Sequence, residues 1–224
     1  MDYSSKTSFG IYESLRILVP GFYFATLTFF FYRSYIQPAF PTDLSRPSLI
    51  LLFLFFGIVA GFSLYAKETT KRRKAFLENQ PSRYISDKAR TMKNMPLVDE
   101  DAARRLYFFI LNNHMPTSFH EKIFFFGTVY HIMIGIRRTS FWFAILATAC
   151  VAVEISRSIA LAELQGLLFF TVSIWSIYVL NVRYNKADRK MQENYQDQIF
   201  WLQMNGELVE ATLRIYRDVT TPQR

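Results

Sequence analysis

The sequence has little of what enzymes and secreted proteins use to build their sites. A single cysteine, Cys150, occurs in 224 residues, which excludes a disulfide framework and a thiol metal cluster. The chain has no His-Glu-x-x-His motif, no clustered carboxylates, no glycine-rich phosphate loop and no Gly-x-Ser-x-Gly elbow. These absences remove the common classes of metalloenzyme, nucleotide-binding enzyme and serine hydrolase. We therefore expect no catalytic residue, no metal site and no cofactor.

Charge is also missing from four long apolar runs, and these predict the fold. A helix needs about 20 apolar residues to cross a hydrocarbon core of about 30 Å, and only a hydrogen-bonded helix satisfies an open-ended backbone in lipid. The runs are Ile17–Tyr32, Pro47–Ala66, Thr139–Val153 and Leu164–Val182. With their flanking residues they predict transmembrane helices at about 14–35, 47–66, 139–159 and 164–183. The expected fold is an all-α membrane protein with four transmembrane helices.

The distribution of basic residues predicts the orientation of these spans. The segment 67–138 contains 14 of the 26 Lys and Arg residues against 7 acidic ones. Loops rich in Lys and Arg stay on the cytoplasmic side during insertion, so both termini should also be cytoplasmic. We expect a multi-pass protein of the cell's inner membrane. The net charge of +8 is then explained by orientation and by contact with anionic lipid headgroups rather than by nucleic acid.

The chain accordingly divides into residues 1–66 with two spans, the cytoplasmic segment 67–138, residues 139–183 with two more spans, and the tail 184–224. The segment 67–138 opens with a basic cluster that suits a stop-transfer collar, a headgroup contact or a phosphate ligand: Lys71, Arg72, Arg73 and Lys74. Residues 79–95 contain Pro81 and show no periodicity, which predicts a loop. Acidic residues at 99–101 predict the start of a helix over 99–112.

A second helix is predicted over 118–138, beginning at a capping box formed by Ser118 and Glu121. It is apolar almost all round, and its central residues make it a candidate coupling helix between the cytoplasmic segment and the third span: Phe124, Phe125, Phe126, Tyr130 and His131. Such a helix must be buried against the helix 99–112, at the membrane surface, against a neighbouring subunit or as a re-entrant segment. Arg137 and Arg138 at its end are candidate contacts for lipid headgroups or a ligand.

The tail carries an apolar stripe at helical spacing from Met191 to Tyr216, with a break expected at Asn205-Gly206. The helix 118–138 is its obvious partner in the sequence. Together the loop 67–138 and the tail predict a helical cytoplasmic module, although a coiled coil between subunits is an alternative.

Small residues within the spans predict close helix contacts. Gly57, Ala60 and Gly61 form a small-residue motif that suits either an oligomer interface or packing within one bundle. Pro20 and Gly21 predict a hinge in the first span, because proline removes a helical hydrogen bond.

Charged residues also lie near the ends of the predicted spans. Glu13 and Arg16, like Glu154 and Arg157, are three apart and can pair on a helix. If the protein conducts ions, Glu154 and Glu163 are the candidate residues for a pore mouth.

Three functions fit this pattern. The first is an oligomeric membrane effector or sensor whose cytoplasmic module receives a signal or a cytosolic protein partner and couples it to pore formation, gating or membrane perturbation. Small multi-pass proteins of this organisation are similar, in architecture only, to membrane-acting components of prokaryotic anti-phage defence. The second is a non-conducting scaffold that anchors a cytosolic partner. The third is a lipid-acting enzyme using His114, His120 or His131. His120 and His131 lie about 16 Å apart along one straight helix and cannot bind one metal together.

Overall fold

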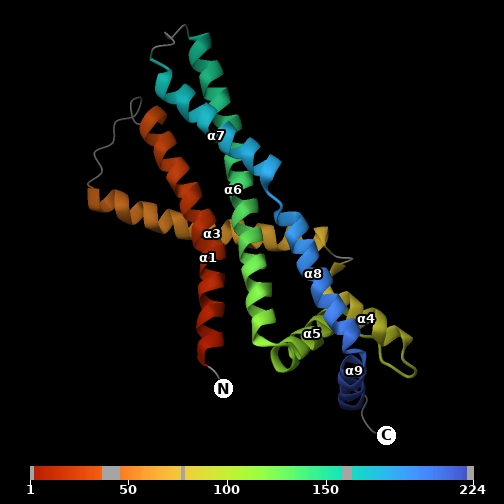
Figure 1. The fold of residues 1–224 in the computed structure, drawn as a ribbon. Helices are drawn as coiled ribbons and strands as arrows, with labels where there is room; N and C mark the ends of the chain where they lie inside the picture. The colour runs from red at the N-terminus through yellow and green to blue at the C-terminus, as the bar shows by residue number, and fades with distance from the viewer. Residues whose placement is uncertain (1–2, 37–45, 77–78, 158–162, 221–224) are drawn as a thin grey trace.

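The computed structural model describes residues 3–36, 46–76, 79–157 and 163–220 of the chain. Within these ranges nearly every residue is helical (Figure 1). The elements are α1 (Tyr3–Phe31), a π-helical turn η1 (Tyr32–Ile36), α3 (Arg46–Ala75), α4 (Pro81–Thr91), α5 (Glu100–His114), α6 (Thr117–Ser156), α7 (Gln165–Tyr184), α8 (Ala187–Met204) and α9 (Gly206–Thr220).

Four helices are long and apolar enough to cross a membrane: α1, α3, α6 and the helix that begins at Gln165. The prediction of an all-α membrane protein with four spans is therefore confirmed. The outer surface of α3 fits a lipid environment, because large apolar side chains such as Leu51, Phe55 and Phe62 are more than half exposed. Contiguous exposed apolar surface of this kind is unusual for a protein in water.

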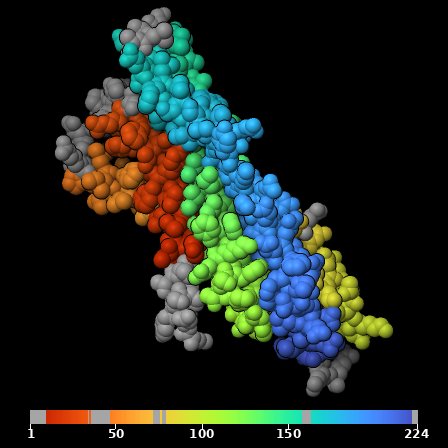
Figure 2. All heavy atoms as spheres, in the orientation of Figure 1, coloured from red at the N-terminus to blue at the C-terminus, as the bar shows by residue number. Residues whose placement is uncertain are grey.

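The helices form two regions, and Figure 1 shows how they are joined. The span region contains α1, α3, α7 and the C-terminal half of α6. We call the second region the helical module: it contains α4, α5, α8, α9 and the N-terminal half of α6. In Figure 1 α3 lies across α1, and α7 leads directly into α8. Figure 2 shows α8 lying alongside the N-terminal half of α6.

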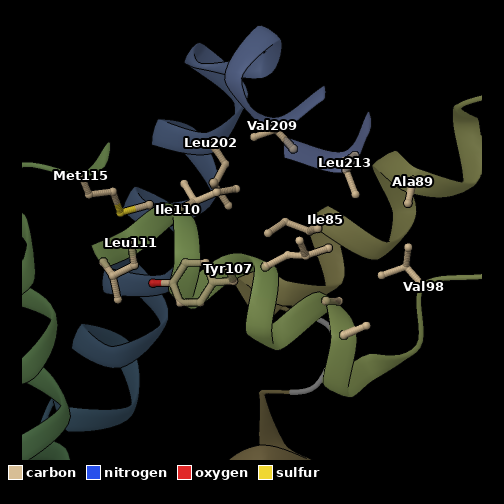
Figure 3. Packing of buried hydrophobic residues seen from close by; sticks show 13 residues of the cluster. Ile85, Ala89, Val98, Tyr107, Ile110, Leu111, Met115, Leu202, Val209 and Leu213 are labelled. Carbon is tan, nitrogen blue, oxygen red and sulfur yellow. The ribbon is translucent and has the colours of Figure 1, made fainter. Parts of the chain in front are cut away.

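The module has its own apolar core, built by the loop segment and the tail as the sequence predicted (Figure 3). Ile85, Ile110, Leu202, Val209 and Leu213 are all fully buried there and come from four different helices. Ion pairs close its edge, with Lys122 Nζ 2.6 Å from Asp197 Oδ2 and Lys88 Nζ 2.8 Å from Glu210 Oε1. The Lys88 ammonium lowers the pKa of the Glu210 carboxyl through its hydrogen bond.

Two further clusters of buried apolar residues lie outside the module core, one within the span region and one between the span region and the module. The first packs α1, α6 and α7 through Phe31, Phe143 and Ile174. The second brings together the end of α3, the middle of α6 and the start of α8: Phe76, Tyr130, Ile134, Ala187 and Met191. Its position makes it the apolar contact between the spans and the module.

The helix predicted over 118–138 and the third span form one continuous helix, α6, of 40 residues. Its N-terminal half packs against α8, the partner that the apolar stripe of the tail predicted, and against α1, which was not among the four placements considered. The apolar stripe of the tail supplies much of this contact, because Met191 belongs to the same cluster as Tyr130 and Ile134. The tail breaks at Asn205, where α8 ends and α9 begins at Gly206.

Three local predictions were wrong or fall outside the described residues. Residues 81–91 form α4 rather than a loop, because Pro81 occupies the first helical position, where its missing amide is harmless. The capping box of Ser118 and Glu121 is not formed, since α6 begins at Thr117 after Pro116 without a side-chain cap. The predicted extension of the third span to 159 ends outside the described residues, as α6 stops at Ser156.

Candidate functional site

The polar site with most contacts between helices lies at Arg16, where α1, α3 and α6 meet near the module. Its Nη1 donates to Glu13 Oε1 at 2.6 Å, Nη2 donates to the Phe124 carbonyl at 3.1 Å, and Nε donates to Thr128 Oγ1 at 3.1 Å. The other carboxylate oxygen of Glu13 accepts from the Tyr65 hydroxyl at 3.1 Å. We call these five residues the Arg16 network. It ties the three helices together by charge-assisted hydrogen bonds in a region that is largely shielded from solvent.

The sequence predicted the pairing of Glu13 with Arg16 near the end of the first span, and the pair is present. The structure adds that Arg16 is 7 % exposed and turns toward α6. Gly127 makes this possible, because a Cβ at that position would lie 2.6 Å from Arg16 Nη2. No sequence motif marked Gly127, Thr128 or Tyr65 as partners, since their relation to Arg16 spans more than 45 residues of chain.

A second charged pair joins α3 to α6 beside this network. Arg138 Nη1 donates to Glu68 Oε1, and Glu68 is only 3 % exposed. Arg138 was predicted to contact headgroups, so its carboxylate partner is a finding of the structure. Glu68, an acidic residue three positions before the basic cluster that follows the second span, was the signal that the sequence offered. Arg137 next to it lies 3.4 Å from Asp188 at an exposed position.

The five residues of the candidate coupling helix all lie in α6, and the structure separates their roles. Phe124 belongs to the Arg16 network through its carbonyl, whereas Phe125 is half exposed. Phe126 stacks edge-on against Phe125 with ring centroids 5.6 Å apart. Tyr130 is buried against Phe76, with centroids 5.8 Å apart.

His131 is 1 % exposed, and its ring centroid lies 5.1 Å from that of Tyr65. The described residues contain no group of three or more His, Cys, Asp or Glu side chains that could hold a metal ion.

The small residues of the second span pack against the first span of the same chain. A Cβ on Gly21 would lie 2.1 Å from the Gly57 carbonyl oxygen, and one on Gly61 would lie 2.3 Å from the Ile17 carbonyl oxygen. Ala60 beside them is half-buried. Of the two uses left open by the sequence, the structure displays packing within the bundle.

Pro20 and Gly21, predicted as a hinge, lie where α1 contacts both neighbours. The Pro20 ring fits over Gly135 of α6, where a Cβ would come within 2.8 Å of Pro20 Cβ. Helix α1 continues through Pro20, and its two halves point in different directions in Figure 1.

The candidate pore-mouth residues lie at the opposite end of the span region, and only one of them is exposed. Glu154 is 8 % exposed, with Oε1 accepting from the Tyr35 hydroxyl at 2.7 Å and from Arg157 Nη1 at 3.3 Å. Its surroundings suit a carboxylate that holds η1 against α6 better than one facing an aqueous path. Glu163 is exposed. Among the described residues, no hydrogen bond or ion pair joins Glu154 to Glu163.

The contact of Tyr35 with Glu154 gives a testable prediction. We expect Tyr35→Phe to lower the free energy of unfolding by about 2 kcal/mol, because it removes a hydrogen bond to a buried charged group. The measurement is thermal or chemical unfolding of the purified protein in detergent. Tyr184→Phe is the matched control, since Tyr184 is exposed, and it should change nothing. Equal behaviour of the two variants would show that the Tyr35 contact does not contribute.

The basic cluster after the second span lies in the last turns of α3. Lys71 is exposed, while the side chains of Arg72, Arg73 and Lys74 lie outside the described part of the structure. The headgroup contact predicted for this cluster therefore stays a prediction.

Comparison with known proteins adds no assignment to this geometry. The chain matches no protein-family model, and neither the curated proteins nor the solved structures contain a significant match to it.

Proposed function

We propose that this protein is an oligomeric membrane sensor or effector of the inner membrane. Its helical module lies on the cytoplasmic side with both termini, receives a signal or a protein partner, and drives the spans to open a pore or perturb the bilayer. The charge distribution of the segment 67–138 supports this orientation.

The observation that carries the proposal is the continuity of α6. Its 40 residues, about 60 Å of helix, begin at the module and end at Ser156, just past Glu154, which contacts η1. A displacement of the module is therefore a displacement of a span, with no flexible connection between them. The spans and the module are also joined through α7 and α8, and this second connection is short, because only Asn185 and Lys186 separate the two helices. The turn is held by the Ala187 amide, which donates to Asn185 Oδ1 at 2.7 Å.

The charged contacts at the level of the Arg16 network support a coupling role. Arg16 and Glu68 are buried polar groups where apolar residues would pack without a desolvation cost. Such groups define one relative position of α1, α3 and α6, and a shift of α6 would have to break and remake them. We propose an oligomer because aromatic side chains fill the space between the spans of one chain, which leaves no room there for an aqueous path. The large apolar outer surface of α3 is available for contact with another subunit.

The test separates coupling from folding. We expect overexpressed wild-type protein to depolarise cells, as followed by a membrane-potential dye, and to purify as an oligomer. Inserting two glycines after Arg138 should abolish depolarisation, because it interrupts α6 between the module and the spans. Inserting two glycines after Asn94, in the connection between α4 and α5, is the control and should preserve depolarisation. A monomer that never depolarises cells would overturn the proposal.

A non-conducting scaffold is the second candidate, and one observation favours it. The module exposes large apolar side chains on its outer surface, among them Leu97, Phe109, Phe200 and Met204. Such a surface suits a docked protein partner. A scaffold predicts an oligomer or monomer that retains a cytosolic partner in pull-downs while liposomes containing it stay tight to ions.

A further inference from the structure

A cavity of about 300 Å³ lies between the span region and the module. Its walls come from α1, α3, α4, α5, α6 and α8, so that it touches every helix of the junction except α7 and α9. Glu13 and Tyr65 line it from the span side, and Tyr107 and Gln198 line it from the module side. A small molecule in this place would contact both regions at once.

Two polar groups of residues that line the cavity have no hydrogen-bond partner within the part of the chain that the structure describes. Gln198 is 1 % exposed; its Oε1 accepts from the Tyr107 hydroxyl at 2.6 Å, while its Nε2 has no partner among the described residues. The hydroxyl of Thr69, also buried, has none either. Burying such groups unsatisfied is unfavourable, and a ligand head with several acceptor atoms would offer each of them a partner. In Figure 3 the Tyr107 ring lies in the module core and its hydroxyl points toward the side where Leu111 lies.

The remaining charges at the cavity favour an acceptor-rich ligand. Both oxygens of Glu13 already accept hydrogen bonds from Arg16 and Tyr65. Arg104 also lines the cavity, and its partly exposed guanidinium forms an ion pair with Glu100, with Nη2 2.7 Å from Oε1. Burial raises the pKa of the Tyr107 phenol, so this hydroxyl stays protonated and keeps donating to Gln198 Oε1. The donors open to a ligand are therefore Gln198 Nε2 and the Thr69 hydroxyl, while the one carboxylate of the wall already accepts from Arg16 and Tyr65.

The rest of the wall is apolar. Phe108, Leu111, Ile123, Phe124 and Met191 surround the polar groups. The volume is at the lower end of the range for small-molecule sites, which limits a ligand to the size of a substituted ring or a short chain. The cavity thus matches a molecule with a compact acceptor head and a small apolar body.

We propose that this cavity binds a small amphipathic molecule whose carboxylate or phosphate head accepts hydrogen bonds from Gln198 and Thr69 and whose apolar body packs on Phe108, Leu111 and Met191. Such a head can belong to a soluble metabolite or to a membrane lipid, because the span side of the cavity reaches α1 and α3. Binding would hold the module against the spans. This regulatory part rests on the proposed function, whereas binding itself does not.

The experiment measures binding by the shift of the unfolding temperature, with two sources of the head kept apart. Soluble probes are benzoate and phenyl phosphate, added to protein in phosphatidylcholine nanodiscs. The lipid probe is phosphatidic acid, added to the same nanodiscs without soluble ligand. A saturable rise with either kind of probe supports the proposal and identifies the source. No saturable rise with any of the three overturns it.

Variants locate the binding site. Gln198→Glu keeps the acceptor for Tyr107 but replaces the free donor with a carboxylate, so an anionic head should bind about tenfold more weakly or less. Thr69→Val should weaken binding in the same direction without adding charge. Gln196→Glu is the matched control, because Gln196 is exposed on the same helix. Wild-type affinity in both Gln198→Glu and Thr69→Val would place the ligand elsewhere and overturn the assignment.

Depolarisation of cells, measured in parallel, separates the two proposals. If the probes bind and the wild-type protein never depolarises cells, the cavity assignment stands and the proposed function fails. If depolarisation occurs and Gln198→Glu alters neither binding nor depolarisation, the proposed function stands and the cavity assignment fails.

Discussion

Replacing Gly21 with alanine is expected to lower the free energy of unfolding by about 3 kcal/mol, at the upper end of the usual cost of overpacking. The new Cβ would lie 2.1 Å from the Gly57 carbonyl oxygen and 2.7 Å from the Gly61 Cα. Both obstacles are backbone atoms of a helix, so they cannot rotate away as a side chain can. The two helices must separate, and the aromatic contacts beside the crossing, such as Phe22 on Phe53, separate with them.

The measurement is unfolding in detergent, followed by circular dichroism. Gly166→Ala is the control, because nothing lies within 4 Å of a Cβ at that helical position. It should be neutral or stabilising by up to about 1 kcal/mol, since alanine favours helix over glycine. Gly61→Ala should behave like Gly21→Ala. If the variants Gly21→Ala and Gly61→Ala caused an oligomer to dissociate but left the unfolding free energy of the monomer unchanged, these glycines would instead belong to an interface between subunits.

The fold could be predicted from the sequence because hydropathy and charge act locally. Four uncharged runs must become helices in lipid, and the apolar stripe from Met191 to Tyr216 must find a partner. The prediction failed at α4, where Pro81 was taken to break a helix. Proline breaks a helix in its interior but favours its first position. The positions that α4 buries, Ser82, Ile85 and Ala89, do recur at helical spacing, but only one of them is a large apolar residue, so the stripe was missed.

The candidate site could be predicted only in part. The pair Glu13 and Arg16 follows from helical spacing, but the contact of Arg16 with Thr128 joins residues 112 positions apart. Such contacts depend on how helices pack, which one sequence does not reveal. Gln198 was missed although it lies seven residues after Met191 and four before Leu202, on the buried face of α8, because its side chain is polar and interrupts the apolar stripe. Its burial follows from the position of α8 against α5 and α6.

Replacing Arg138 with methionine is the second change with a large expected effect, about 3–5 kcal/mol of unfolding free energy. Methionine keeps much of the apolar stem of the side chain, so the loss comes from the charge. Glu68 would remain 3 % exposed without its cation, and an uncompensated buried carboxylate is far more costly than the pair itself is stabilising. The result is measured by chemical unfolding in detergent beside the wild type.

Arg137→Met is the matched control, because the neighbouring arginine pairs with Asp188 at an exposed position, where such pairs contribute about 0–1 kcal/mol. The double variant Arg138→Met with Glu68→Gln should recover most of the loss, since it leaves no charge buried. Similar losses for Arg137→Met and Arg138→Met would contradict the assignment. If the double variant regains stability but no longer depolarises cells, the pair contributes to the position of α3 against α6 rather than to folding. That result is expected of a contact that α6 must break when the module moves.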